Sequence, residues 1–81
     1  MNEELIRKYQ EIISLLQYRN PKCSFNGEFV MGDNGKIAFK LIYFNPNEEN
    51  WGGYGSKTFK YMKTNEDALR YFIKSAQNRV F

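Results

Sequence analysis

The first apolar pattern along the chain is helical and covers residues 2–20. Its apolar residues recur at the i, i+4, i+7, i+11 spacing of one helix face: Leu5, Tyr9, Ile12 and Leu16. Asn2 stands where an N-cap is expected, ahead of two glutamates that suit the positive end of the helix dipole. Pro21 disfavours a helical conformation in the residue before it, so we expect the helix to end by about Arg19.

The pattern then changes to the alternation that is typical of strands. Three segments show it: residues 23–31 (CSFNGEFVM), 36–44 (KIAFKLIYF) and 56–64 (SKTFKYMKT). Between the first two, Asp33, Asn34 and Gly35 favour a tight hairpin turn. One face of the resulting sheet carries Phe25, Phe29, Ile37, Phe39, Leu41, Phe59 and Tyr61. The other carries Val30, Lys40, Ile42, Phe44, Thr58, Lys60 and Met62.

A second helical pattern follows the third strand. Thr64 is a good N-cap, and Asp67 three residues later resembles the second member of a capping box. An apolar stripe runs along Leu69, Phe72, Ile73, Ala76 and Val80, and the opposite face carries Glu66, Arg70 and Lys74 at i, i+4 spacing. The predicted fold is α+β, a single domain over residues 1–81. Its element order is α-β-β-β-α, with a three-stranded antiparallel sheet and both helices packed on one face.

The least regular stretch is residues 45–55, NPNEENWGGYG. Pro46 ends the second strand, and the glycines give the backbone freedom to turn. A phosphate cradle would need a helix directly after the glycines, whereas the pattern here continues as a strand. The sequence allows two interpretations of Trp51 and Tyr54: they cover the edge of the core, or they anchor a partner.

Composition excludes most catalytic chemistry. The chain has no histidine and one cysteine, Cys23, which excludes histidine-based nucleophile systems and a thiolate zinc site. The only adjacent acidic residues of the loop, Glu48 and Glu49, diverge rather than converge on a substrate, and the spacing of a calcium loop is missing. We therefore expect no enzyme activity, no cofactor and no metal. The N-terminal residues have no apolar leader, and no run is long enough to cross a membrane, so a cytoplasmic protein is expected.

The charge is uneven. Residues 51–81 hold six basic side chains against two acidic ones, which suits either nucleic acid or an acidic protein surface. The element order is similar to that of double-stranded-RNA-binding domains. However, GDNG stands where that family has a Gly-Pro-x-His loop, and TNEDAL stands where it has a Lys-Lys-x-Ala-Lys phosphate clamp. The segment SKTFKYMKTNEDALRYF resembles the N-terminal DNA-binding domains of phage integrases, and this resemblance implies that Lys40, Thr58 and Lys60 face the major groove.

These patterns favour a non-enzymatic binding module that acts on a protein, in particular on nucleic-acid-handling machinery. Its size and composition are similar to those of phage-encoded inhibitors such as anti-CRISPR proteins, so an inhibitor or adaptor of phage or mobile-element type is expected. The predicted partner-binding residues are Trp51, Tyr54, Phe44, Lys40, Lys60 and Met62. The alternative is direct nucleic-acid binding through Lys40, Lys57, Lys60 and Lys63. The apolar content of the second sheet face also allows a homodimer.

Overall fold

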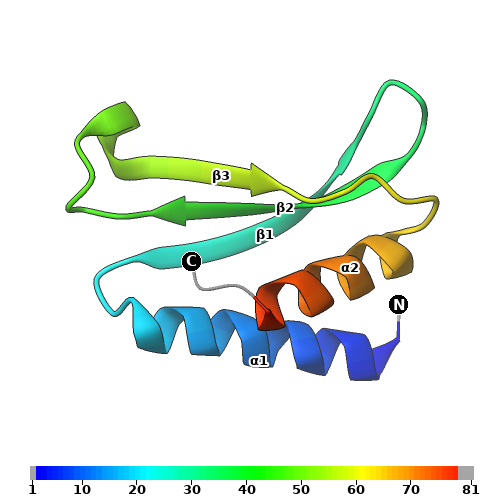
Figure 1. The fold of residues 1–81 in the computed structure, drawn as a ribbon, viewed down its shortest axis with the longest axis horizontal. Coiled ribbons are helices and arrows are strands. Elements are labelled where there is room, and N and C mark those ends of the chain that lie inside the picture. The colour runs from blue at the N-terminus through cyan, green and yellow to red at the C-terminus, as the bar shows by residue number, and fades with distance from the viewer. Residues whose placement is uncertain (1, 79–81) are drawn as a thin grey trace.

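The structure is a computed structural model that describes residues 2–78, without the side chains of residues 50 and 51. It has an α+β fold with the predicted order of two helices and a three-stranded antiparallel sheet (Figure 1). The elements are α1 (Glu3–Arg19), β1 (Ser24–Met31), β2 (Ile37–Phe44), the short 3₁₀ helix η1 (Asn50–Gly53), β3 (Tyr54–Thr58) and α2 (Asn65–Gln77). Among the described residues, no helix has the length and apolar character to cross a membrane.

The central strand of the sheet is β2, which pairs with β1 on one side and with β3 on the other. Phe39 lies opposite Phe29 of β1, and Leu41 lies opposite Lys57 of β3. The hairpin between β1 and β2 turns at Gly35, whose φ of 73° lies in the left-handed region that favours glycine. Figure 1 shows the sheet above the two helices, with α2 beneath the middle of the sheet and α1 below it.

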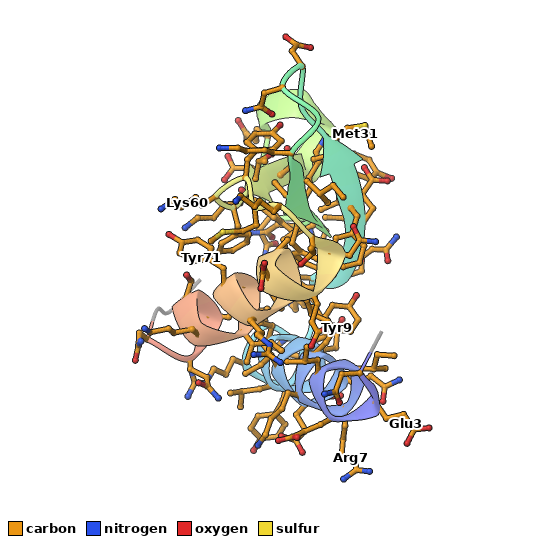
Figure 2. All side chains as sticks on the ribbon, turned by 90° about the vertical axis from the view of Figure 1, so that its right-hand side faces the viewer. Glu3, Arg7, Tyr9, Met31, Lys60 and Tyr71 are labelled. Carbon is orange, nitrogen blue, oxygen red and sulfur yellow. The ribbon has the colours of Figure 1, made fainter. Side chains whose placement is uncertain are left out.

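The core forms between the sheet and the two helices. Its buried members are Ile12 and Leu16 of α1, Phe39 and Leu41 of β2, Phe59 after β3, and Leu69, Phe72, Ile73 and Ala76 of α2. The predicted apolar stripes of both helices are therefore confirmed over the described residues, while Val80 lies outside them. Figure 2 shows Tyr9 on the side of α1 that faces α2 and the sheet, whereas Glu3 and Arg7 point away.

Phe39 is the aromatic centre of this core and is only 2% exposed. Its ring centroid lies 4.3 Å from that of Phe72, 5.5 Å from Tyr9 and 5.7 Å from Phe29. The ring also lies directly over Gly27 of β1, where a Cβ atom would stand 2.1 Å from the Phe39 Cζ. Glycine at this position therefore makes room for the ring at the centre of the core.

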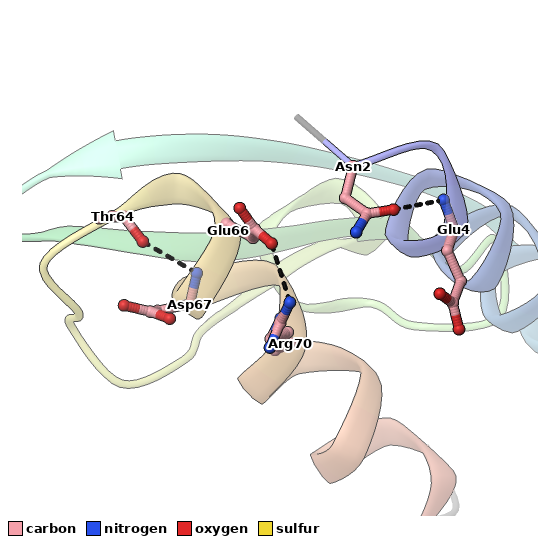
Figure 3. A network of polar contacts seen from close by, with 6 residues as sticks. All are labelled: Asn2, Glu4, Thr64, Glu66, Asp67 and Arg70. Carbon is pink, nitrogen blue, oxygen red and sulfur yellow. Dashed lines mark hydrogen bonds and ion pairs between the residues drawn. The ribbon is translucent and has the colours of Figure 1, made fainter.

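Both helices begin as their sequences predict (Figure 3). The Asn2 Oδ1 accepts the Glu4 N–H at 2.8 Å, and the Thr64 Oγ1 accepts the Asp67 N–H at 3.1 Å. These bonds satisfy N–H groups that have no partner inside the helix. On the exposed face of α2, Arg70 forms an ion pair with Glu66 at 2.8 Å.

The third strand differs from its prediction. It begins earlier, at Tyr54, and ends at Thr58, so the predicted range of residues 56–64 is wrong. The Phe59 N–H still donates to the Phe39 carbonyl, but the next bridge joins Ile37 to Met62. From Phe59 to Met62 the chain advances by three residues, whereas the paired stretch of β2, from Phe39 to Ile37, advances by two. The extra residue is a β-bulge. The alternation of apolar residues continues through the bulge and does not reveal it.

Candidate functional site

The candidate site is the face of the sheet opposite the core, which we call the open face. Directly opposite residues of antiparallel strands point to the same side, so the register assigns its members. In rows across the sheet these are Ser24, Phe44 and Tyr54; Asn26, Ile42 and Ser56; Glu28, Lys40 and Thr58; and Val30 and Ala38. The predicted assignment of Lys40, Ile42, Phe44 and Thr58 to one face is confirmed.

An aromatic pair occupies one end of the open face. The ring centroids of Phe44 and Tyr54 lie 4.9 Å apart with an interplanar angle of 48°. Tyr54 is 62% exposed, and Phe44 and the neighbouring Ile42 are half-buried although they belong to the central strand. A central strand is normally the best-covered part of a sheet, so these side chains leave apolar surface open to a partner.

The next part of the open face is charged. Lys40 stands between Glu28 of β1 and Thr58 of β3. Lys60 follows β3 and is exposed, and Figure 2 shows its side chain reaching outward from the body of the molecule. The open face therefore combines an aromatic end with a part that holds two lysines and one glutamate.

The bulge after β3 changes which residues join this face. Lys60 and Tyr61 together oppose Ala38, whereas Met62 lies opposite Ile37 and so belongs with the core-facing residues. The predicted position of Met62 on the open face is wrong for this reason. Tyr61 was predicted on the face that carries Phe39 but lies against Gly32, where a Cβ atom would stand 2.9 Å from its ring. Tyr61 thus joins the residues beside the open face, and the sequence pattern could not predict this because it does not reveal the bulge.

The four lysines of the nucleic-acid alternative are not brought together. Lys57 lies opposite Leu41 on the core-facing side, and its Nζ lies 5.5 Å from the centroid of the Phe59 ring. Lys63 is exposed in the segment that joins β3 to α2. Only Lys40 and Lys60 remain on the open face.

The loop before β3 is held by backbone contacts. The Asn45 N–H donates to the Gly53 carbonyl at 2.7 Å, and Gly53 has a φ of 89°. A Cβ atom at Gly53 would stand 2.5 Å from the Asn45 carbonyl oxygen. This geometry places Tyr54 at the start of β3, beside Phe44. The backbone of Trp51 belongs to η1, but its side chain lies outside the described residues, so its predicted role stays a prediction.

A hollow lies on the core-facing side of the sheet, near the end of α1. It has a volume of about 410 Å³ and is lined by Asn20, Cys23, Phe25, Tyr43, Asn45, Ser56 and Lys57. The Gln17 side chain donates to the Cys23 carbonyl at its margin, and the Cys23 thiol is free. Within residues 2–78, no group of three histidine, cysteine, aspartate or glutamate side chains is placed to hold a metal ion.

Comparisons with protein-family models, with curated proteins and with solved structures find no match to this chain. The open face is therefore interpreted from its own geometry.

Proposed function

We propose that the chain is a non-enzymatic binding module whose open face binds a protein. The observation that carries this proposal is the half-exposed pair of Phe44 and Tyr54 on the same face of the sheet as Lys40, opposite the core. Aromatic residues are enriched at protein interfaces, where a mostly apolar centre is surrounded by polar groups. The open face has this composition, with Ser56 and Thr58 along its β3 edge.

The size of the face indicates how tightly it binds. Three strands at ~4.8 Å spacing and four rows at roughly 6.8 Å cover about 400 Å², against the ~800 Å² per partner of a standard interface. Fully burying an apolar side chain stabilises a complex by ~1.5–3 kcal/mol, while association costs at least ~4 kcal/mol. We therefore expect a transient complex with a Kd on the order of micromolar, unless the partner also contacts the loop at residues 45–53.

The charges on the face favour a protein over nucleic acid. Two lysines on the open face can neutralise about two phosphates, whereas duplex-binding proteins commonly contact ~6–10. Glu28 stands directly opposite Lys40 and would repel a phosphate there. A protein surface can carry charges of both signs beside an apolar patch, so it can meet Lys40 and Glu28 together while covering Phe44. An inhibitor or adaptor of nucleic-acid-handling machinery is the form of this function that we propose.

The test uses exposed tyrosines as a matched pair. Tyr54 is 62% exposed on the open face, and Tyr18 is 84% exposed on α1, so Tyr54→Ala and Tyr18→Ala should both fold. A partner is first captured from an extract of the encoding organism, and its affinity for each purified variant is then measured by calorimetry. We expect Tyr54→Ala to weaken binding about tenfold or more, a loss within the range of interface hot spots, and Tyr18→Ala to leave it unchanged.

Two results would contradict the proposal. One is an equal effect of both tyrosine variants on partner affinity. The other is binding of single- or double-stranded DNA or RNA at micromolar protein with an affinity that falls steeply as salt rises, because counterion release marks direct phosphate contacts. Gel shifts over a series of salt concentrations measure this second outcome.

A further inference from the structure

The two edges of the sheet differ in how they are protected against another strand. The β3 edge is short, is followed by a bulge and carries Lys57 and Lys60, and these features discourage strand pairing. The β1 edge is eight residues long and contains no proline, no bulge and one charged residue, Glu28. The β1 edge is therefore the one that can accept an added strand.

The hydrogen-bond pattern shows which groups of β1 are available. The Gly32 N–H donates to the Lys36 carbonyl at 2.8 Å, and backbone groups alternate between the two sides of a strand. The backbone N–H and carbonyl groups of every second residue counted back from Gly32, including Val30 and Glu28, therefore bond to β2. On β2, the backbone N–H and carbonyl of Ile37 both bond to Met62, on the side away from β1. This agrees with the same alternation.

The opposite set on β1 points to the free edge: Phe25, Gly27, Phe29 and Met31. Among the described residues, the Gly27 N–H donates only to the neighbouring Asn26 Oδ1, at 2.9 Å. A local bond of this kind is replaced readily by a carbonyl of an incoming strand. The edge thus offers alternating donors and acceptors over the length of β1.

An apolar groove lies beside this edge, on the side that faces α1. It has a volume of about 180 Å³ and is lined by Ile6, Tyr9, Gly27, Glu28, Phe29, Phe39 and Leu69. Gly27 lets the Phe39 ring reach the wall of the groove, because a Cβ atom at this position would stand 2.1 Å from the Phe39 Cζ. Ile6 forms part of the wall and is 38% exposed. The groove has room for one apolar side chain of moderate size.

We propose that the β1 edge and this groove together bind an extended segment of another protein by strand addition. In that mode, backbone hydrogen bonds supply affinity, and pockets for alternate side chains supply specificity. The partner residue opposite Gly27 points to the same face as Gly27 and places an apolar side chain in the groove. The partner residue opposite Glu28 points to the open face, and a lysine or arginine there best complements the Glu28 carboxylate. The occupant is thus a strand with an apolar residue directly next to a basic one.

The probe is a short blocked peptide of threonines with one leucine and an adjacent lysine at its centre. Its control is the same peptide with N-methyl groups on the amides that would bond to β1. Proton exchange of the protein amides is followed by NMR during titration. We expect the Phe25 and Phe29 amides, which point to the free edge, to gain protection about tenfold or more at saturating peptide. The Asn26 and Glu28 amides already bond to β2 and should change little.

Two protein variants of similar exposure complete the test. Ile6 and Leu15 both lie on α1, 38% and 41% exposed, but only Ile6 lines the groove. Ile6→Glu should weaken peptide binding at least tenfold, and Leu15→Glu should leave it unchanged. Because this site is independent of the aromatic pair, Tyr54→Ala should bind the peptide normally even if it fails to bind the partner of the open face.

Several results would overturn the assignment. These are no binding of the leucine peptide, equal binding of the N-methylated control, or an equal effect of Ile6→Glu and Leu15→Glu. Protection of the Phe25 and Phe29 amides that rises with protein concentration in the absence of peptide would also overturn it, since the occupant would then be a second copy of the chain.

Discussion

Replacing Gly27 with alanine tests the packing of the core most sharply. The new Cβ would lie 2.1 Å from the Phe39 Cζ and 2.8 Å from its Cε2, well inside van der Waals contact. Phe39 is 2% exposed and packs against Tyr9, Phe29 and Phe72, so its ring must give up part of this packing to make room for the methyl group. Overpacking a core costs ~1–3 kcal/mol.

A gain in chain entropy opposes this cost. Gly→Ala at a compatible position stabilises a protein by ~0.4–1 kcal/mol through the unfolded chain, and no left-handed φ is found at Gly27. The clash is the larger effect, so we expect Gly27→Ala to lower the free energy of unfolding by about 1–2 kcal/mol. In a domain of this size that lowers Tm by roughly 4–8 °C for each kcal/mol.

Urea unfolding of a double-mutant cycle measures this effect. Phe39→Leu removes the ring that the new methyl group meets, so Gly27→Ala should cost less in the Phe39→Leu background than in the natural one. An unchanged or raised urea midpoint in Gly27→Ala, or additive effects of the two substitutions, would show that the new methyl group does not clash with the Phe39 ring.

Three further predictions concern the helix cap, the loop and pH. Thr64→Ala removes the acceptor for the Asp67 N–H and should cost ~1 kcal/mol in urea unfolding, while Thr64→Ser should recover most of it. Gly53→Ala must adopt a φ near 89° against the Asn45 carbonyl; it should cost more than ~1–2 kcal/mol and lower Tm, and an unchanged Tm would contradict the loop geometry. Burial raises the pKa of the Tyr9 hydroxyl above its ordinary value of 10.0, so as pH rises the unfolded state loses this proton before the folded state does. The contribution of Tyr9 to the free energy of unfolding therefore falls as pH rises above about 10. Unfolding measured from pH 8 to pH 11 should show a smaller alkaline loss in Tyr9→Phe than in the natural protein.

Much of the fold could be predicted because the local signals agree with one another. The cap residues Asn2 and Thr64 mark both helix starts, and Pro21 limits the end of α1 close to the observed Arg19. Alternating residues define β1 and β2 within one residue of their observed bounds. Those same alternations assign Lys40 and Phe44 to one face, because side chains of a strand alternate with a period of two.

The rest depends on contacts between distant residues. The bulge after β3 follows from the pairing of Ile37 with Met62, and nothing in the local pattern distinguishes Met62 from a residue in regular alternation. The space that Gly27 provides for Phe39 is a contact between two strands, and the sequence shows only a glycine inside a strand. The groove beside β1 results from that contact, so it could not be predicted from the sequence.

We propose that the protein partner binds the open face and does not bind the opposite face of the sheet. Lys40 and Lys57 test it most directly, because they lie on neighbouring strands but on opposite faces of the sheet. Calorimetric titration of the partner should show that Lys40→Glu weakens binding about tenfold or more, within the range for a charge at an interface, and that Lys57→Glu changes it little. Equal losses of affinity in the two variants, or a loss in Lys57→Glu alone, would show that the open face is not the binding surface.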